Sequence, residues 1–423
     1  MSQYSSSHMV NLEAELPAPS AERIAVHLTN DALRQVRGGH PWVWDGSIVR
    51  ASAQGAAGDL AVIFDDKRKF AAIGLWDPTA PIAVRVLHQG SPRTIDADFF
   101  ADKLLTAFAH RQPLHDRTDT TAYRLVHGEN DGLPGLVVDR YDRTLVVKLD
   151  SPVWVPHLAM LVEPLVELAD AERVVVRASR RIIEDLPPIL RNSPTVFGSR
   201  PEGPIEFFEN GLQFEADVER GQKTGHFLDQ RDNRQLIATR CNGARVLDVF
   251  CNSGGFSVYA AAGGARSVHS IDVSEHAIAA TVRHVELNRL GLGFETEHTS
   301  AVGDAFEAME DLADHRQRFD VVIVDPPSFA PNSASAPAAR RAYRRLTSLA
   351  VELLANGGTL LQASCSSRIP ADEFYALVTG EIAESDHKAQ HTIRTGHALD
   401  HPIGFEQGSY LKAVLADIVP NRL

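Results

Sequence analysis

Cysteine is scarce in this sequence, with 3 cysteines among 423 residues, at positions 241, 251 and 365. An odd and sparse set of cysteines argues against a disulfide framework and is typical of a reducing compartment, so we expect a cytoplasmic protein. The chain also lacks cysteine or histidine clusters with metal-ligand spacing. We therefore expect neither a zinc site nor another metal site.

Basic residues and long apolar runs are also in short supply. Acidic residues outnumber basic ones by 55 to 42, which gives a formal net charge of −13. This balance excludes a protein that binds nucleic acid with its whole surface, but it permits a local basic groove. No run approaches the ~20 apolar residues of a membrane span, and the N-terminus lacks the basic start and apolar stretch of a signal peptide. We therefore expect no membrane partner and no secretion.

Four segments differ in their patterning. Residues 1–22 are polar and predict a flexible tail. Short apolar runs broken by Gly, Asp and Pro predict a small β domain over 23–92. One helical pattern and several strand patterns predict an α+β module over 93–210. From 211 to 423, short apolar strands alternate with helical segments, which predicts an α/β domain with a doubly wound parallel sheet.

A candidate cofactor site lies in the α/β segment. Asp248 ends a predicted strand, a turn containing Gly254 follows, and a helix then begins. Asp272 and Asp304 follow the next two predicted strands, where acids can accept ribose hydroxyls or an adenine amino group. The sequence has neither GxGxxG nor a P-loop, so S-adenosylmethionine, which has no phosphate, fits better than a nucleotide. The alternative is that these acids merely cap helices.

A candidate catalytic pair follows two further strands. Asp325-Pro326-Pro327 comes directly after FDVVIV, and the two prolines hold the backbone extended. We count Asp325 and Pro326 among the cofactor contacts as well. Cys365 ends the following strand between two serines, where a thiolate could act as a nucleophile. The alternatives are a rigid turn at the prolines and a cysteine that simply packs in the core.

Together, this acid and this thiol could activate C5 of cytosine for methylation. Cytosine C5 is too weak a nucleophile to attack a sulfonium methyl, but addition of a thiolate to C6 makes C5 reactive. An acid near N3, here Asp325, would stabilise the charge that develops there. The residues do not identify the base that removes the C5 proton.

With these motifs in view, the sequence resembles the bacterial PUA-domain-containing 23S ribosomal RNA cytosine-C5 methyltransferases. The matching runs are GGHPWVW at 38–44, QKTGHFLDQRDNR at 222–234, DVFCNSGGFS at 248–257, DPPSF at 325–329, SCS at 364–366, HP at 401–402 and SYLK at 409–412. The resemblance implies an N-terminal PUA β-barrel, a middle α+β domain and a class I methyltransferase domain. It implies cofactor contacts at Thr224, Phe227, Asp229, Arg231, Phe250, Asp272, Asp304 and Asp325.

Two positions bear on the reaction that this resemblance implies. Many RNA cytosine-C5 enzymes carry a second cysteine after the prolines, which helps product release, whereas this chain has Ser328. Release therefore uses another base, or the reaction differs. A related branch that methylates guanine N7 has two asparagines at the place of Ser364 and Cys365, so Cys365 favours methylation of carbon.

RNA contacts are predicted next to the catalytic motif. Residues 331–341 predict a mobile loop, and RRAYRR at 340–345 follows, with Arg340, Arg341, Tyr343 and Arg344 as candidate phosphate and base contacts. The alternative is a solvated helix face. We expect large-subunit ribosomal RNA as the partner, and the oligomeric state is open, a homodimer included.

Three functions therefore compete. The leading hypothesis is a cytosine-C5 methyltransferase of 23S ribosomal RNA that uses Cys365 and Asp325. The first rival is a methyltransferase that acts on a ring nitrogen, with Cys365 as a packing residue. The second rival is an RNA-binding assembly factor that is not an enzyme.

Overall fold

The computed structural model describes residues 10–330 and 332–421, which fall into two compact units. Of the described residues, unit 1 contains 10–207, 215–226 and 399–405. Unit 2 contains 208–214, 227–330, 332–398 and 406–421. A hairpin of β12 (Ile205–Glu209) and β13 (Leu212–Ala216) contributes residues to both units.

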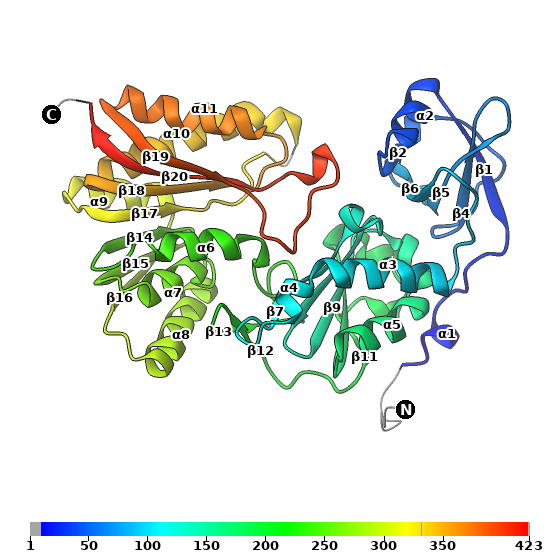
Figure 1. Cartoon of the computed structure of the whole chain (residues 1–423), viewed down its shortest axis with the longest axis horizontal. Coiled ribbons are helices and arrows are strands. Elements are labelled where there is room, and N and C mark those ends of the chain that lie inside the picture. Colours follow the sequence, from blue (N-terminus) through cyan, green and yellow to red (C-terminus); the bar gives the residue numbers. More distant parts are fainter. Residues whose placement is uncertain (1–9, 331, 422–423) are drawn as a thin grey trace. The chain divides into compact units, whose positions relative to one another are not determined.

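The first sheet of unit 1 confirms the predicted small β domain. Its strands are β1 (Arg23–Leu28), β2 (Trp42–Trp44), β3 (Ile48–Ala51), β4 (Leu60–Phe64), β5 (Phe70–Trp76) and β6 (Ile82–Gln89). They form a six-stranded sheet in the order β2-β6-β5-β4-β1-β3, in which β1 and β4 are parallel and the other pairs are antiparallel (Figure 1). Helix α2 (Asn30–Arg37) buries Leu33 and Val36 in the same core.

The second sheet of unit 1 forms the α+β module. Its strands are β7 (Ala122–His127), β8 (Leu136–Tyr141), β9 (Thr144–Leu149), β10 (Arg173–Ala178) and β11 (Thr195–Phe197), with helices α3 (Ala97–His110), α4 (Gln112–His115) and α5 (Ala159–Ala169). Side chains from both sheets, such as Leu75 and Leu125, belong to one hydrophobic cluster. The two modules therefore share a core, and the boundary between 92 and 93 stays a prediction.

The start of the chain is partly packed, which corrects the expected flexible tail. Helix α1 (Leu12–Glu15) is capped by the Asn11 side chain, and Leu12 and Leu16 are buried in the core of unit 1. Two leucines in a polar segment are enough to attach it to an apolar surface. Residues 1–9 of the predicted tail lie outside the described residues.

Unit 2 contains a seven-stranded sheet. Its strands are β14 (Arg245–Val249), β15 (Ser267–Asp272), β16 (Glu297–Val302), β17 (Phe319–Val324), β18 (Leu354–Ser364), β19 (His387–Thr395) and β20 (Lys412–Pro420). The order is β16-β15-β14-β17-β18-β20-β19. The first five strands are parallel, as predicted, and β20 and β19 add an antiparallel edge.

Helices cover both faces of this sheet. They are α6 (Arg231–Ala238), α7 (Gly255–Ala262), α8 (Glu275–Leu292), α9 (Ala305–Asp314), α10 (Ala336–Leu353) and α11 (Ala371–Glu384). Along β14, Val246 packs with α6 and α7, whereas Leu247 and Val249 pack with α9 and α10. This alternation explains why the strands read as continuous apolar runs. In the described part of the chain, no helix combines the length and apolar character that membrane crossing requires.

Candidate active site

The loop between β14 and α7 has the tight geometry that its glycine predicted. Gly254 adopts a left-handed conformation with φ of +77°, and a Cβ placed there would lie 2.6 Å from Cγ2 of Thr281. Thr281 donates a hydrogen bond from its hydroxyl to the Asn252 carbonyl over 2.9 Å, so α8 holds the loop from behind. Glycine is therefore required at 254 both by conformation and by space.

Asp272 joins the end of β15 to this loop. Its two carboxylate oxygens accept hydrogen bonds from the backbone N–H groups of Asn252 and Ser274, each over 2.9 Å. Ser274, and not Asp272, caps helix α8. Asp272 is only half-buried, and the next residue, Val273, is 74 % exposed, so polar and apolar surface is available side by side. The helix-cap alternative does not explain Asp272.

Asp304 behaves differently from Asp272. Its side chain is exposed and accepts hydrogen bonds from the N–H groups of Phe306 and Glu307 over 2.9 and 3.2 Å, which makes it the N-cap of α9. The alternative that this acid caps a helix therefore holds for Asp304, although a carboxylate that caps a helix can still accept a further hydrogen bond. Its contact with the cofactor stays a prediction.

Asp248 lies in β14, just before the loop between β14 and α7, and is fully buried. Ser257 of α7 donates a hydrogen bond to one of its oxygens over 2.6 Å. Further hydrogen bonds link Ser257 to Ser270 and Ser270 to His298. The other oxygen of Asp248 has no hydrogen-bond partner among the described residues. Burial raises the pKa of Asp248 to about 7. Its hydrogen bond with Ser257 connects β14 to α7. A direct contact between Asp248 and the cofactor stays a prediction.

The 227–234 segment contains the start of α6. A 3-10 turn over Leu228–Gln230 leads directly into the helix. Asp229 is 3 % exposed and accepts a hydrogen bond from the Tyr410 hydroxyl over 2.8 Å, and Arg231 is also buried. Phe227 and Phe250 are half-buried. Of these four predicted contacts, the two phenylalanines keep accessible surface.

Arg234 connects α6 to the cofactor loop. Its guanidinium forms a bidentate pair with Glu209 over 2.8 and 2.7 Å and donates to the Phe227 carbonyl over 3.0 Å. A Cβ at Gly255 would lie 2.9 Å from Cδ of Arg234, so this side chain packs directly against the start of α7. We did not single out Arg234 in the sequence, because its role depends on a partner in the β12–β13 hairpin.

Thr224 belongs to unit 1, unlike the loop residues above. It is fully buried, and its hydroxyl donates to Asp139 over 2.6 Å and lies 2.9 Å from the Tyr141 hydroxyl. The shown contacts of Thr224 therefore serve a buried polar network. Its predicted contact with the cofactor has no support from these bonds and stays a prediction.

Asp325 and Cys365 follow the carboxyl ends of two adjacent parallel strands. Strand β17 pairs with β18 so that Val324 lies opposite Gln362, which puts both residues at one edge of the sheet. The Sγ atom of Cys365 lies 4.0 Å from the carbonyl oxygen of Pro326. Asp325 and Cys365 are half-buried, whereas Pro326 is buried. The structure thus brings the thiol next to the Asp-Pro-Pro backbone, and the predicted placement of the Asp325 carboxyl beside the thiol stays a prediction.

The three cysteines differ in accessibility. Cys241 and Cys251 are buried, and Cys365 keeps partial exposure. Burial raises the pKa of Cys241 to about 12 and also raises the pKa of Cys251, so neither forms a thiolate readily. Ser328, at the place of the second cysteine in many related enzymes, is exposed.

Lys412 is a residue near the thiol that the sequence analysis did not single out. It begins β20 opposite Ser364 of β18, and it is 2 % exposed. Burial lowers the pKa of Lys412 to about 8, and the nearby Cys365 thiolate opposes this shift. The one available signal was its place in the SYLK run at 409–412.

The predicted RNA-binding cluster is only partly available, because Tyr343 is fully buried. Tyr343 packs in the core between Phe329 and Phe374, which corrects its assignment as a base-stacking residue. The expected mobile loop is also corrected, because α10 begins at Ala336. Residue 331 lies outside the described residues.

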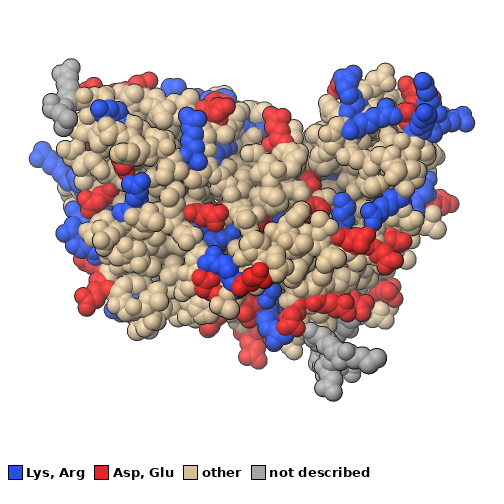
Figure 2. Space-filling view, in the orientation of Figure 1, with Lys and Arg blue, Asp and Glu red and all other residues tan. Residues whose placement is uncertain are grey.

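The arginines of the same helix face away from the core. Arg341 and Arg344 are exposed, whereas Arg340 forms an ion pair with Glu373 of α11. On the face of the molecule drawn in Figure 2, basic and acidic side chains are interspersed. Two exposed arginines therefore remain as candidate phosphate contacts, and the third is engaged with a carboxylate.

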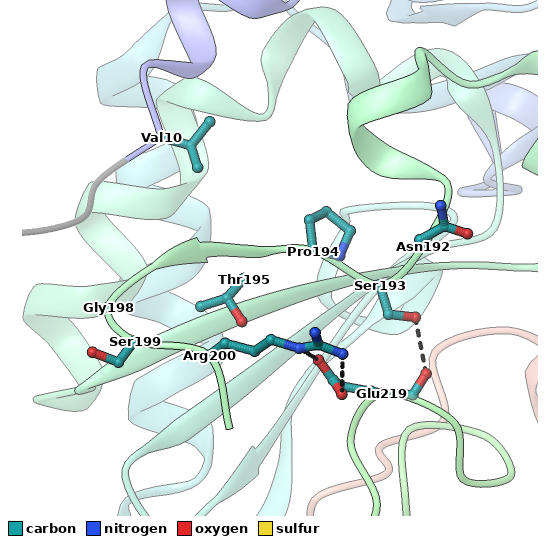
Figure 3. Close-up of a pocket in the computed structure, with 9 residues that line it drawn as sticks. All are labelled: Val10, Asn192, Ser193, Pro194, Thr195, Gly198, Ser199, Arg200 and Glu219. Atoms are coloured by element: carbon teal, nitrogen blue, oxygen red, sulfur yellow. Dashed lines mark hydrogen bonds and ion pairs between the residues drawn. The ribbon is translucent and has the colours of Figure 1, made fainter. Parts of the chain in front are cut away.

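A cavity of about 710 Å³ lies in unit 1 (Figure 3). Its lining residues are Val10, Asn192, Ser193, Pro194, Thr195, Gly198, Ser199, Arg200 and Glu219. Arg200 donates to Glu219 within it over 2.7 Å. None of our predicted site residues lines this cavity, so it contributes nothing to the assignment of the active site.

Family models and curated relatives match this chain. Residues 154–398 match a family described as S-adenosylmethionine-dependent methyltransferase, and 26–89 match a PUA-like domain. A ribosomal RNA large subunit methyltransferase from Deinococcus radiodurans is 40 % identical over 94 % of this chain and 98 % of its own length. Ribosomal RNA large subunit methyltransferase I from Shewanella amazonensis is 36 % identical over 90 % of this chain and 95 % of its own.

A solved structure confirms the fold. A protein from Streptococcus mutans, described as a SAM-dependent methyltransferase, aligns with a TM-score of 0.79, covering 93 % of this chain and 99 % of that one. The sequence identity is 19 %, so this similarity concerns the fold alone. A neighbour with the same TM-score was solved in complex with SAH.

The cofactor can be tested against the residues that are present. S-adenosylmethionine needs a loop that approaches closely and acids at strand ends, and the tight turn at Gly254 and the half-buried Asp272 provide these features. The residues fit this cofactor. Since the methyltransferase model and the relatives cover most of the sequence, this chain belongs to the S-adenosylmethionine-dependent ribosomal RNA large subunit methyltransferases, with an N-terminal PUA-like domain.

Proposed function

We propose that this protein methylates C5 of a cytosine in 23S ribosomal RNA, with Cys365 as the nucleophile. The observation that carries the proposal is the 4.0 Å distance from Sγ of Cys365 to the Pro326 carbonyl oxygen at the carboxyl edge of the sheet. The names of the relatives support large-subunit ribosomal RNA as the substrate. The partial exposure of Cys365 supports its role over that of the two buried cysteines.

The proposed reaction begins with the thiolate of Cys365. It adds to C6 of cytosine and forms a C–S bond, and the electron pair of the C5–C6 double bond moves toward N3. Asp325, in its acid form, donates a hydrogen bond to N3 and stabilises the charge there. C5 then has the nucleophilic character that the aromatic ring lacks.

Bound S-adenosylmethionine supplies an electrophilic methyl group. We propose that the following residues hold this cofactor beside the thiol: Thr224, Phe227, Asp229, Arg231, Asp248, Phe250, Gly254, Asp272, Asp304, Asp325 and Pro326. Asp272 is the acid that best fits a ribose contact, because one of its oxygens is fixed by Asn252 of the loop and the other by Ser274 before α8.

Product release needs a base for the proton on C5. When that proton leaves, its electron pair restores the C5–C6 double bond, the C6–S bond breaks, and the thiolate of Cys365 returns. Ser328 replaces the second cysteine that performs this task in many related enzymes, so we expect another base. The exposed Arg341 and Arg344 would contact RNA phosphates near the site.

Trapping on RNA that contains 5-fluorocytosine tests the proposal, because the fluorine cannot leave as the proton does. We expect the wild-type chain to form a stable protein–RNA adduct that the C365A variant does not form. C241A, which removes a buried cysteine, serves as the control and should trap normally. The affinity of C365A for S-adenosylmethionine, measured by calorimetry, should stay within about twofold of the wild-type value. This limit corresponds to a change of about 0.4 kcal/mol in binding free energy.

Two outcomes would refute the proposal. A C365A variant that methylates at the wild-type rate would exclude the thiol mechanism. Methylation of natural RNA without any adduct on the fluorinated RNA would indicate transfer to a ring nitrogen instead.

A further inference from the structure

Lys412 lies beside the strand end that carries Cys365. Strand β20 pairs with β18 in antiparallel register, with Lys412 opposite Ser364, the residue before Cys365. The Lys412 ammonium donates to the carbonyl of Ser366, the residue after Cys365. Lys412 therefore pairs with the residue before Cys365 and hydrogen-bonds to the residue after it.

The surroundings of this ammonium are unusual for a lysine. Lys412 is 2 % exposed, and its second acceptor is the Tyr410 carbonyl at 3.1 Å. An ammonium has three N–H donors. Within residues 10–330 and 332–421, the structure provides this group with two carbonyl acceptors and no carboxylate partner. One donor and the full positive charge are left for a further partner.

A buried cation without an anion is costly, and lysines are seldom fully buried unless they are paired. The anion whose charge favours the ionised form of Lys412 is the thiolate of Cys365. Attraction between the two groups works in both directions, so the ammonium must also favour ionisation of the thiol. The cost of burying Lys412 is offset when Cys365 carries its negative charge.

Other groups face the same thiol from the elements packed around it. Asp325 comes from the loop after β17, at the same edge of the sheet, and acts in its acid form in the proposed reaction. Tyr343 comes from α10, and its hydroxyl bonds to the Ser364 hydroxyl at 2.8 Å. Burial, together with the charges of Cys365 and Asp325, raises the pKa of Tyr343, so this phenol stays neutral. Among these three neighbours, Lys412 provides the positive charge.

We propose that Lys412 is a positioning residue that stabilises the thiolate of Cys365 and fixes the backbone on either side of it. The thiol releases its proton to solvent, and Lys412 remains an ammonium throughout. The inference rests on the proposed function, in which Cys365 is the nucleophile.

The test is the pH profile of Cys365 alkylation by iodoacetamide, followed on the tryptic peptide 346–368, which contains neither of the other cysteines. An unperturbed thiol titrates near pH 8.5, and we expect the wild-type midpoint to lie below this value. K412M should raise the midpoint by about one pH unit, which lowers the alkylation rate at pH 7.5 about tenfold and leaves it unchanged near pH 11. K412R keeps the charge and should restore most of the rate.

The control is K388M, which removes an exposed lysine from β19 and should leave the profile unchanged. A purely structural role of Lys412 would change the rate by one factor at every pH, and this result would overturn the proposal. So would a wild-type midpoint at or above pH 8.5. If K412M fails to fold by circular dichroism, K412Q, which keeps a donor for the carbonyls, replaces it.

Trapping on 5-fluorocytosine RNA keeps this proposal separate from the proposed function. A shifted alkylation profile without any RNA adduct would sustain the effect of Lys412 on the thiol and refute the nucleophilic role of Cys365. An adduct with an unshifted profile would do the reverse.

Discussion

The pair between Arg234 and Glu209 is a buried electrostatic contact of unit 2 that should be sensitive to substitution. Both side chains are buried, at 2 % and 0 % exposure, and both N–O distances are below 3 Å. R234M leaves the Glu209 carboxylate buried without its cation, and breaking such a pair costs about 3–5 kcal/mol. The same change removes the side chain that packs against Gly255, so we also expect weaker binding of S-adenosylmethionine.

Hydrogen exchange is the suitable assay, because all four tryptophans, at 42, 44, 76 and 154, lie in unit 1 and their fluorescence would not follow unit 2. Mass spectrometry of peptides from β14 and β17 reports the core of the sheet. A loss of 3–5 kcal/mol should accelerate their slowest amides by about two to three and a half powers of ten.

An exposed pair in the same unit provides the control. Arg289 and Glu286 are 2.8 Å apart with side chains 50 % and 45 % exposed, and such exposed pairs contribute little to stability because water screens them. R289M should therefore change the same exchange rates less than about fivefold. The double variant E209L/R234M removes the unpaired carboxylate and should recover most of the loss. Equal effects of R234M and R289M would refute the reasoning.

Three further predictions concern the candidate site. Because Asp248 titrates near pH 7 when folded and near 3.9 when unfolded, its contribution to stability is complete below about pH 4 and is lost at about 1.4 kcal/mol per pH unit up to about pH 7. Urea unfolding at pH 5 and pH 7 should show that D248N lacks this decline, and an equal slope in both proteins would contradict the assignment. G254A should weaken binding of S-adenosylmethionine at least about tenfold, whereas G293A, with a similar φ of +72° but open space around it, should bind normally. If both variants bind alike, steric crowding at the loop is not the cause. R341E/R344E should reduce the slope of log affinity for RNA against log salt by about two, and an unchanged slope would remove α10 from the interface.

Several elements were predictable because their cause is local. The strands of unit 2 are buried on both faces, so each is a short apolar run, and β14, β15, β17 and β18 lie where such runs occur. The turn at Gly254 was predictable because a left-handed residue without space for a Cβ must be glycine. The placement of Asp325 and Cys365 at one edge of the sheet followed from a general rule, since parallel strands end at one edge of a sheet.

The errors also have physical causes. Tyr343 was assigned to RNA because it lies among arginines, but three residues of a helix span most of a turn, so neighbours in sequence face opposite sides. Arg341 and Arg344 face solvent while Tyr343 packs between two phenylalanines. The polar start of the chain was assigned to a tail, although Leu12 and Leu16 pack in the core of unit 1.

Composition and local pattern predicted the α/β class of this protein and the turn after β14, and they singled out Asp325 and Cys365 as candidates, because each of these depends on neighbouring residues alone. Tertiary structure decided which charges those groups meet. Lys412 reaches the backbone next to Cys365 only because β20 pairs antiparallel with β18, and Glu209 reaches Arg234 only because the β12–β13 hairpin returns to α6. Burial strengthens contacts between charged groups because the interior has a low dielectric constant. It is a property of the packed chain and is not encoded at any single position.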